Sequence, residues 1–327
     1  MVTFLPSRPG RLADVPSFTR AIGGAESNVA CALAAAGHRV RWVSRVGADG
    51  FGDHLVEAVA AYGVDTSAVR RDPGRPTGVY FRTATDRATD AHEVLYYRAG
   101  SAASAMSPRT VPYEDVGDAR VLHLSGITAA LSPGCLDLVR ALTAPRPGRP
   151  LVSFDVNHRA GLWRGADPSV LLDLARGADL VLTGDDEAEA AWGLRGADAI
   201  RAALPEPAVL VVKHGARGAT AYARTGARET VTSVPAPRVD VVAPVGAGDA
   251  FAAGFLSATL RDLPLARRLR HGHLMAAAAL TVPGDLAAPP ATGHADRLAA
   301  LGDDAWGRLH LVPGWTRTGE DQEVRTP

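Results

Sequence analysis

The chain is nearly without lysine and cysteine, and it has no long apolar run. Lys213 is the only lysine, and 35 basic residues balance 35 acidic ones to a formal net charge of zero. A neutral surface gives no electrostatic footprint for nucleic acid or for an anionic membrane. With no bilayer-spanning run and no signal-peptide pattern, we expect a cytoplasmic protein whose partners are small molecules.

The two cysteines and the length limit the class of protein. Cys31 and Cys135 each lie in an apolar run, as small core residues do in a reducing compartment, so no disulfide is predicted. A chain of 327 residues with 46% hydrophobic content suits one large α/β unit with a small appendage. We assign residues 1–312 to this unit and expect the polar tail, 313–327, to be disordered.

From about residue 121 onward, short apolar runs alternate with helical patterns. The expected strands cover 121–124, 151–155, 180–182 and 209–213, and the expected helices cover 133–143, 168–176 and 185–192. Repeated β-α alternation with nearly all-apolar strands predicts a mostly parallel sheet with helices on both faces. Ligands bind beyond the carboxyl ends of the strands in such folds.

The N-terminal third has a different pattern. Residues 2–5 and 17–22 read as short strands, 40–46 as another strand, and the aromatic runs 77–82 and 93–98 as a hairpin. The hairpin and the two early strands are expected to form a small sheet from about 1–22 and 76–98. This sheet could act as a lid over a polar ligand, form a dimer surface, or only pack on the core.

Residues 239–258, VDVVAPVGAGDAFAAGFLSA, predict a buried strand, a glycine turn and the start of a helix. The turn is Gly246-Ala247-Gly248, and the unpaired amides that follow it favour an anion. Asp249 lies in the first helical turn. It is either an ordinary capping carboxylate or a base that takes a proton from a hydroxyl beside a bound phosphoryl group.

Further polar or glycine positions fall at helix starts or strand ends. Asn28 follows two glycines, so it is either a local backbone partner or a contact for a substrate hydroxyl. The positions at strand ends, expected along one sheet edge, are residues 155–159 with Asn157 and Arg159, Gly184, Glu187, residues 213–215 with Lys213, and residues 246–249. Residues 213–218, KHGARG, fit a plain β-turn as well as a nucleotide border.

Two other site types are disfavoured. The glycines at 47–52, GADGFG, do not have the spacing of the dinucleotide fingerprint G-x-G-x-x-G, so no nicotinamide cofactor is predicted. His271 and His273, two residues apart on an expected helix over 265–282, face different sides of it and make a poor metal pair.

These motifs together resemble the ribokinase family of carbohydrate kinases, also called the PfkB family. Its first signature is similar to residues 23–30, GGAESNVA, closed by Gly37, and its second to residues 245–251, VGAGDAF. Within the family, residues 96–104, YYRAGSAAS, and 155–159, DVNHR, most resemble 2-keto-3-deoxygluconate kinases. The resemblance covers essentially the whole chain and implies a ribokinase-like fold.

The resemblance also implies an activity: ATP-dependent phosphorylation of an acidic sugar, with Mg2+ at the phosphates. We expect a homodimer or higher homo-oligomer formed through the lid. It makes Asp249 the base and Gly246, Ala247 and Gly248 the anion hole. The implied sugar contacts are Gly24, Ala25, Asn28, Tyr80, Tyr96, Arg98 and Arg159, with Asp249. The implied ATP contacts are Asn157, Arg159, Gly184, Lys213, Gly215 and Gly218, with Gly246 and Gly248. Glu187 would either act on the metal through water or serve only as a carboxylate in the first turn of a helix. An arginine pair suits a carboxylate substrate on physical grounds as well, through paired hydrogen bonds.

Three departures from the family pattern qualify these expectations. The sequence begins just after the place where the family has its first core strand. Either the start codon is misassigned, or the edge of the sugar pocket that this strand forms is absent. Ala243 stands where the family often has Asp, which argues against potassium activation, and Gly184 removes a polar side chain near the phosphates. The alternatives are a kinase for ribose, fructose or a nucleoside, and a non-catalytic sugar-binding protein.

Overall fold

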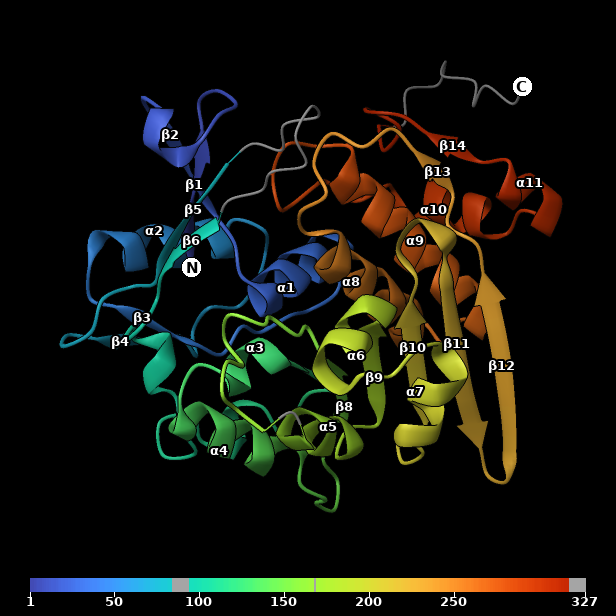
Figure 1. The fold of residues 1–327 in the computed structure, drawn as a ribbon, viewed down its shortest axis with the longest axis horizontal. Helices are drawn as coiled ribbons and strands as arrows, with labels where there is room; N and C mark the ends of the chain where they lie inside the picture. Colours follow the sequence, from blue (N-terminus) through green and yellow to red (C-terminus); the bar gives the residue numbers. More distant parts are fainter. Residues whose placement is uncertain (84–93, 168, 318–327) are drawn as a thin grey trace.

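Six strands form the main sheet of the computed structural model, which describes residues 1–83, 94–167 and 169–317 (Figure 1). In spatial order they are β12 (Arg228–Val234), β11 (Ala219–Thr225), β10 (Val209–Lys213), β9 (Leu180–Gly184), β8 (Leu151–Asp155) and β7 (Val121–Ser125). The strands from β7 to β10 are parallel to one another. Strand β11 is antiparallel to β10, and β12 is antiparallel to β11.

Helices cover both faces of this sheet (Figure 1). One face packs against α1 (Ala25–Ala35), α8 (Ala247–Leu260), α9 (Leu265–Leu280) and α10 (Thr292–Ala299), and the other against α4 (Pro133–Thr143), α5 (Ser169–Arg176), α6 (Asp185–Trp192) and α7 (Ala197–Ala203). Strand periodicity divides the core: Leu180 and Leu182 face the α8 side, and Val181 faces the α4 side. The α/β prediction is confirmed, because both faces of the central strands are buried.

A second sheet of four strands stands beside the main body. Its order is β2 (Phe18–Ile22), β1 (Val2–Pro6), β5 (Val79–Arg82) and β6 (Val94–Tyr97). The β5–β6 pair is antiparallel, and the rings of Phe4 and Phe81 stack across β1 and β5 with centroids 4.6 Å apart. A separate core cluster with Val2, Leu55 and Val59 joins this sheet to α2 (Gly50–Ala60) and α1.

Two strand predictions are wrong. Only β3 (Arg45–Gly47) forms in the segment 40–46, paired with β4 (Arg70–Asp72). The segment 239–242 is not a buried strand: β13 (Arg238–Val239) ends early against β14 (His310–Leu311), and Val241 and Val242 are exposed. In both segments, β-branched residues favour extended backbone, but the strands that form, β3 and β13, pair outside the main sheet.

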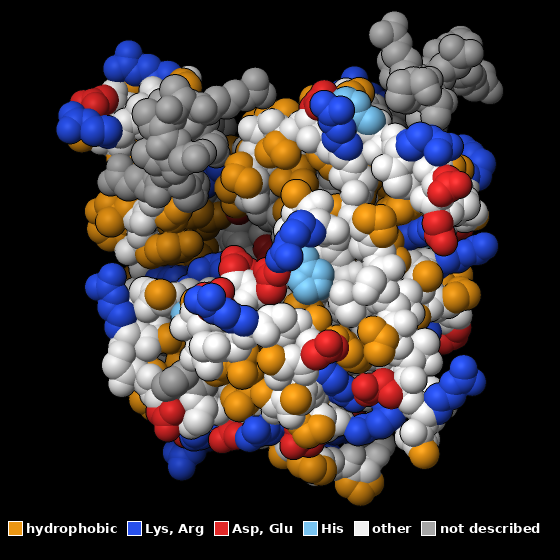
Figure 2. Space-filling view, turned by 45° about the vertical axis from the view of Figure 1, so that its right-hand side comes forward, with side chains coloured by type: hydrophobic (Ala, Val, Ile, Leu, Met, Phe, Trp, Pro, Cys, Tyr) orange, Lys and Arg blue, Asp and Glu red, His pale blue; other side chains and the backbone are white. Residues whose placement is uncertain are grey.

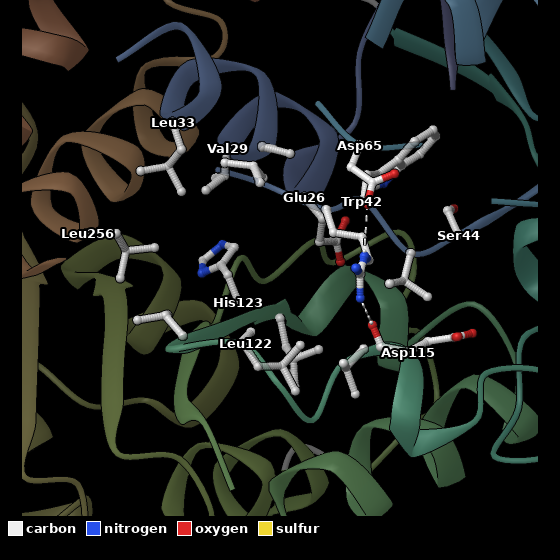
Figure 3. A pocket seen from close by; sticks show the side chains of 18 of the residues that line it. Glu26, Val29, Leu33, Trp42, Ser44, Asp65, Asp115, Leu122, His123 and Leu256 are labelled. Carbon is white, nitrogen blue, oxygen red and sulfur yellow. Dashed lines mark hydrogen bonds and ion pairs between the residues drawn. The ribbon is translucent and has the colours of Figure 1, made fainter. Parts of the chain in front are cut away.

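Strand β7 is an edge strand, since β8 is its one partner among the described strands. A cavity of about 890 Å³ lies along its open side, between β7, α1 and the segment 37–44. Figure 3 shows Leu33, Leu122, His123 and Leu256 pointing into it. The first strand, β1, pairs in the small sheet and not along this edge.

The cysteines and the two histidines of α9 lie inside the protein. Cys31 and Cys135 are both buried and unbridged. His271 and His273 are buried apart, against Asp296 and the Val234 carbonyl, and the described residues hold no cluster that could bind a metal. The short elements α3 (Gly126–Ala129) and α11 (Asp303–Gly307) were not predicted. The connection 84–93 and most of the expected disordered tail, 318–327, lie outside the described residues.

Nothing in the described part of the chain forms a helix long and apolar enough to cross a membrane.

Candidate active site

The N-terminus of α8 is shaped by a glycine that no other residue could replace without rearrangement. Gly246 precedes the helix with a φ of +77°, and a Cβ atom there would lie 2.2 Å from the Asp285 carbonyl oxygen. Ala247 and Gly248 follow as the first helical residues, and Gly248 is exposed. Their backbone amides have no intrahelical acceptor, so the turn presents N–H groups and the positive end of the helix dipole.

Asp249 is held in this first turn by a residue from another helix. Asn28 Nδ2 of α1 donates to Asp249 Oδ2 at 2.8 Å. Burial raises the pKa of the Asp249 carboxyl to about 7, against the lowering effect of the Asn28 hydrogen bond, and the charge of Asp155 raises it further. The side chain is only partly buried by surface area, so solvent and small molecules can still reach it. Its chemistry suits proton transfer near neutral pH.

The start of α1 forms the adjacent wall. Gly24 caps the helix with a φ of +138°, Ala25 is the first helical residue, and Asn28 is 4% exposed. Asn28 Oδ1 is buried and has no hydrogen-bond partner among the described atoms. A buried amide oxygen without a donor is costly, and a ligand hydroxyl would satisfy it.

The small sheet contributes the opposite wall. Tyr80 is buried, and its hydroxyl donates to Asp285 Oδ2 at 2.7 Å, while Tyr96 is 44% exposed with its ring 5.4 Å from that of Tyr80. The Arg98 guanidinium lies over the Tyr96 ring, 4.1 Å from its centroid. Sequence reasoning missed Asp285, which also pairs with buried Arg82 at 3.2 Å; only the loop position after α9 could have indicated it.

Arg98, Arg159 and Asp249 share one electrostatic neighbourhood. Burial lowers the pKa of Arg98, with Tyr96 opposing and the positive charge of Arg159 adding to the effect. The same Arg159 lowers the pKa of Asp249, a smaller influence than burial. Figure 2 shows a hollow between the small sheet and the main body, with acidic and basic side chains around it. The charge of Arg159 thus acts on both Arg98 and Asp249.

The strand-end residues lie at the carboxyl edge of the main sheet, as predicted. Asn157 follows β8 with a φ of +41°, and its buried Oδ1 has no partner within the described structure. Gly184 ends β9 and donates its N–H to Glu187 Oε2 at 2.8 Å. The other Glu187 oxygen, Oε1, is 3.4 Å from Arg159. Because both carboxylate oxygens of Glu187 already have protein donors, it fits a metal through water better than as a direct ligand.

Residues 213–218 form the turn between the antiparallel strands β10 and β11. His214 N–H donates to the Gly218 carbonyl at 2.8 Å, and Gly215 and Gly218 have φ values of +59° and +125°. Lys213 Nζ lies 3.2 Å from both carboxylate oxygens of Asp155. Sequence reasoning did not pair these two residues, although both end parallel strands of the predicted sheet.

None of the predicted site residues lines the cavity of Figure 3. Glu26 reaches that cavity from α1, and its carboxylate accepts hydrogen bonds from the hydroxyls of Ser125 and Thr128. The candidate site is thus the hollow at the carboxyl edge of the sheet, between α1, α8 and the small sheet.

Known proteins resemble this chain over most of its length. Residues 2–292 match the model of the pfkB family carbohydrate kinases. The 2-dehydro-3-deoxygluconokinase of Thermoproteus tenax is 34% identical over 297 residues, 89% of each chain, and that of Bacillus subtilis (strain 168) is 35% identical over 293 residues, 88% of this chain and 89% of the relative. A sugar kinase from Pyrococcus horikoshii, solved in complex with ATP, is 25% identical with a TM-score of 0.78, over 94% of this chain and 97% of that one.

These matches confirm the resemblance that the two signature motifs carry. The chain belongs to the pfkB family of carbohydrate kinases, ATP-dependent phosphotransferases that act on an alcohol group of a sugar.

Proposed function

We propose that this kinase phosphorylates a primary hydroxyl of an acidic keto-deoxy sugar, with 2-keto-3-deoxygluconate as the substrate. The observation that carries the proposal is the placement of two arginines beside the candidate site: Arg98 lies over the Tyr96 ring of the small sheet, and Arg159 lies beside Glu187 at the carboxyl edge of the main sheet. A guanidinium can hold a carboxylate through two parallel hydrogen bonds, whereas a neutral sugar has no group that needs this charge. The names of the two relatives above support the same substrate.

In this proposal the sugar lies between the start of α1 and the small sheet. Gly24, Ala25 and Asn28 contact its hydroxyls, with the free Asn28 Oδ1 as an acceptor, and the exposed ring of Tyr96 packs over it beside Tyr80. Arg98 and Arg159 hold the carboxylate. The reacting hydroxyl then faces Asp249.

The nucleotide occupies the carboxyl edge of the main sheet. Asn157 lies between sugar and phosphates, and Arg159 and Gly184 line the same edge. The turn of Lys213, Gly215 and Gly218 borders the nucleotide, because Gly215 leaves open space in which a ligand can approach the main chain.

The chemistry is an in-line transfer. The sugar oxygen bonds to the γ-phosphorus of ATP, the bond from that phosphorus to the β–γ bridging oxygen breaks, and the hydroxyl proton passes to Asp249. The backbone amides of Gly246, Ala247 and Gly248 donate hydrogen bonds to the phosphoryl oxygens and stabilise the negative charge on these oxygens in the transition state. Mg2+, when bound, neutralises phosphate charge, and Glu187 would reach it through water.

Small-sheet contacts also bear on assembly. Leu95 and Tyr97 of the edge strand β6 are exposed on the face opposite to Tyr96, Tyr97 by 58%. A homodimer through this face would cover them and could place the sheet as a lid. This assembly remains a prediction, and light scattering on the purified protein measures it.

A substrate screen tests the proposed function. ADP release is measured with 2-keto-3-deoxygluconate, fructose, ribose and a nucleoside as acceptors, each at several concentrations. We expect the highest kcat/KM with the acidic sugar. A higher kcat/KM with any neutral acceptor refutes the substrate proposal, and sugar binding without ADP release from any of them would favour a non-catalytic role.

A further inference from the structure

The only lysine of the chain is placed against the anion-binding turn of α8. Lys213 ends β10 and Asp155 ends β8, and both side chains lie on the α8 face of the sheet, with Gly184 of the intervening strand adding no side chain there. A Cβ atom added to Gly248 would lie 3.9 Å from Lys213 Nζ. The ammonium therefore adjoins the first turn of α8, one residue before Asp249.

The hydrogen bonding of this ammonium leaves capacity for a ligand. Its described partners are the two oxygens of Asp155, at 3.2 Å each, and an ammonium has three N–H donors. The side chain of Lys213 is 17% exposed and that of Asp155 is 3% exposed, so the carboxylate is enclosed while the cation keeps an opening. At least one N–H can therefore point to a bound anion.

Charge and burial keep the lysine protonated. Burial alone lowers the pKa of Lys213, but the carboxylates of Asp155, Glu187 and Asp249 outweigh it and raise that pKa above its ordinary value. An arginine at position 213 would present a wider, planar guanidinium, whereas the lysine ammonium is a compact point charge. The cation beside α8 is thus fixed in place and in charge state.

We propose that Lys213 contacts the phosphoryl group during its transfer, as a fixed cation beside the α8 amides, and that Asp155 is the positioning residue that holds it there. This inference rests on the proposed in-line transfer. Lys213 forms and breaks no covalent bond: it donates a hydrogen bond to an oxygen of the moving phosphoryl group, while Asp249 takes the proton.

Kinetics of matched variants separate this role from a structural one. Lys213→Met should lower kcat about a hundredfold, the usual cost of removing one transition-state donor, with little change in the KM for the sugar. Asp155→Asn should lower kcat less, and Lys213→Arg should recover part of the loss. The control is Arg149→Met, which breaks another partly buried ion pair, Arg149 to Asp179 at 2.7 Å, between the starts of β8 and β9 and away from the site; it should leave kcat unchanged.

These kinetics are measured with whichever acceptor the screen shows to be turned over, so a wrong sugar proposal does not affect them. A kcat of Lys213→Met within twofold of the parent, or a loss confined to the KM for ATP, overturns the inference. If Lys213→Met does not fold, Lys213→Arg and the next experiment decide.

A direct test needs no sugar. Lysine labelled with ¹³C at Cε gives a single side-chain NMR signal, because the chain has one lysine. We expect this signal to occupy different positions with Mg2+ and ADP and with Mg2+ and β,γ-imido-ATP, since only the latter carries the γ-phosphoryl group. The same position in both saturated complexes overturns the proposal.

Discussion

Replacing Asp249 by Asn should remove most of the turnover and at the same time stabilise the protein at alkaline pH. The amide keeps an oxygen for Asn28 Nδ2, whose hydrogen bond to Asp249 Oδ2 is 2.8 Å long, but it cannot take a proton. A positioned general base contributes about 10² to 10⁴ in rate, so we expect kcat to fall by about a thousandfold. ADP release under saturating ATP and sugar measures this.

The gain in stability follows from the raised pKa. The pKa of Asp249 is near 3.8 in the unfolded chain and about 7 in the folded chain. Between these values the unfolded state loses its proton first, so rising pH lowers the free energy of unfolding until about pH 7, and the penalty stays constant above it. A difference of about three units corresponds to roughly 2 to 4 kcal/mol at pH 8, and Asp249→Asn should recover much of it.

Urea unfolding of both proteins at pH 8 and pH 5 checks this. The advantage of the variant should shrink by about 2 kcal/mol at pH 5, because the penalty grows with each pH unit above the unfolded pKa and pH 5 is only about one unit above it. Near-normal kcat in Asp249→Asn refutes the base assignment. Equal stabilities at pH 8 refute the burial argument, whatever the turnover.

Three further changes test the neighbouring contacts. Arg159→Ala should raise the KM for the acidic sugar at least tenfold, and more than it raises the KM for ATP. The control, Arg164→Ala, changes an exposed arginine of the same loop and should alter neither KM. Equal effects of the two variants would contradict binding of the sugar carboxylate by Arg159. Asn28→Ala removes the donor that lowers the pKa of Asp249, so the acidic limb of kcat/KM against pH should move to higher pH; an unmoved limb would show that Asp249 does not set it. Gly246→Ala should lose both stability and kcat by forcing a Cβ against the facing carbonyl at a φ of +77°, and thermal unfolding with wild-type behaviour would exclude that strain.

Local patterns in the sequence determined most elements of the main body. The expected strand 209–213 and the helices 133–143 and 185–192 coincide with β10, α4 and α6, because apolar runs between turn residues have few other solutions. The glycine turn before Asp249 was also readable, since only glycine suits its backbone. Alternation of strands and helices then placed the site at one sheet edge.

Contacts between distant segments were decided only by the tertiary structure. The bond between Asn28 and Asp249 joins residues 221 positions apart, and the pairing of Lys213 with Asp155 spans an intervening strand. The same holds for the failed strand prediction: Val241 and Val242 have the composition of a buried strand, yet they lie exposed beyond the end of β13. Burial is the main cause of the raised pKa of Asp249, and burial is a property of the packed chain. The pKa therefore could not be predicted from residues 246–249 alone.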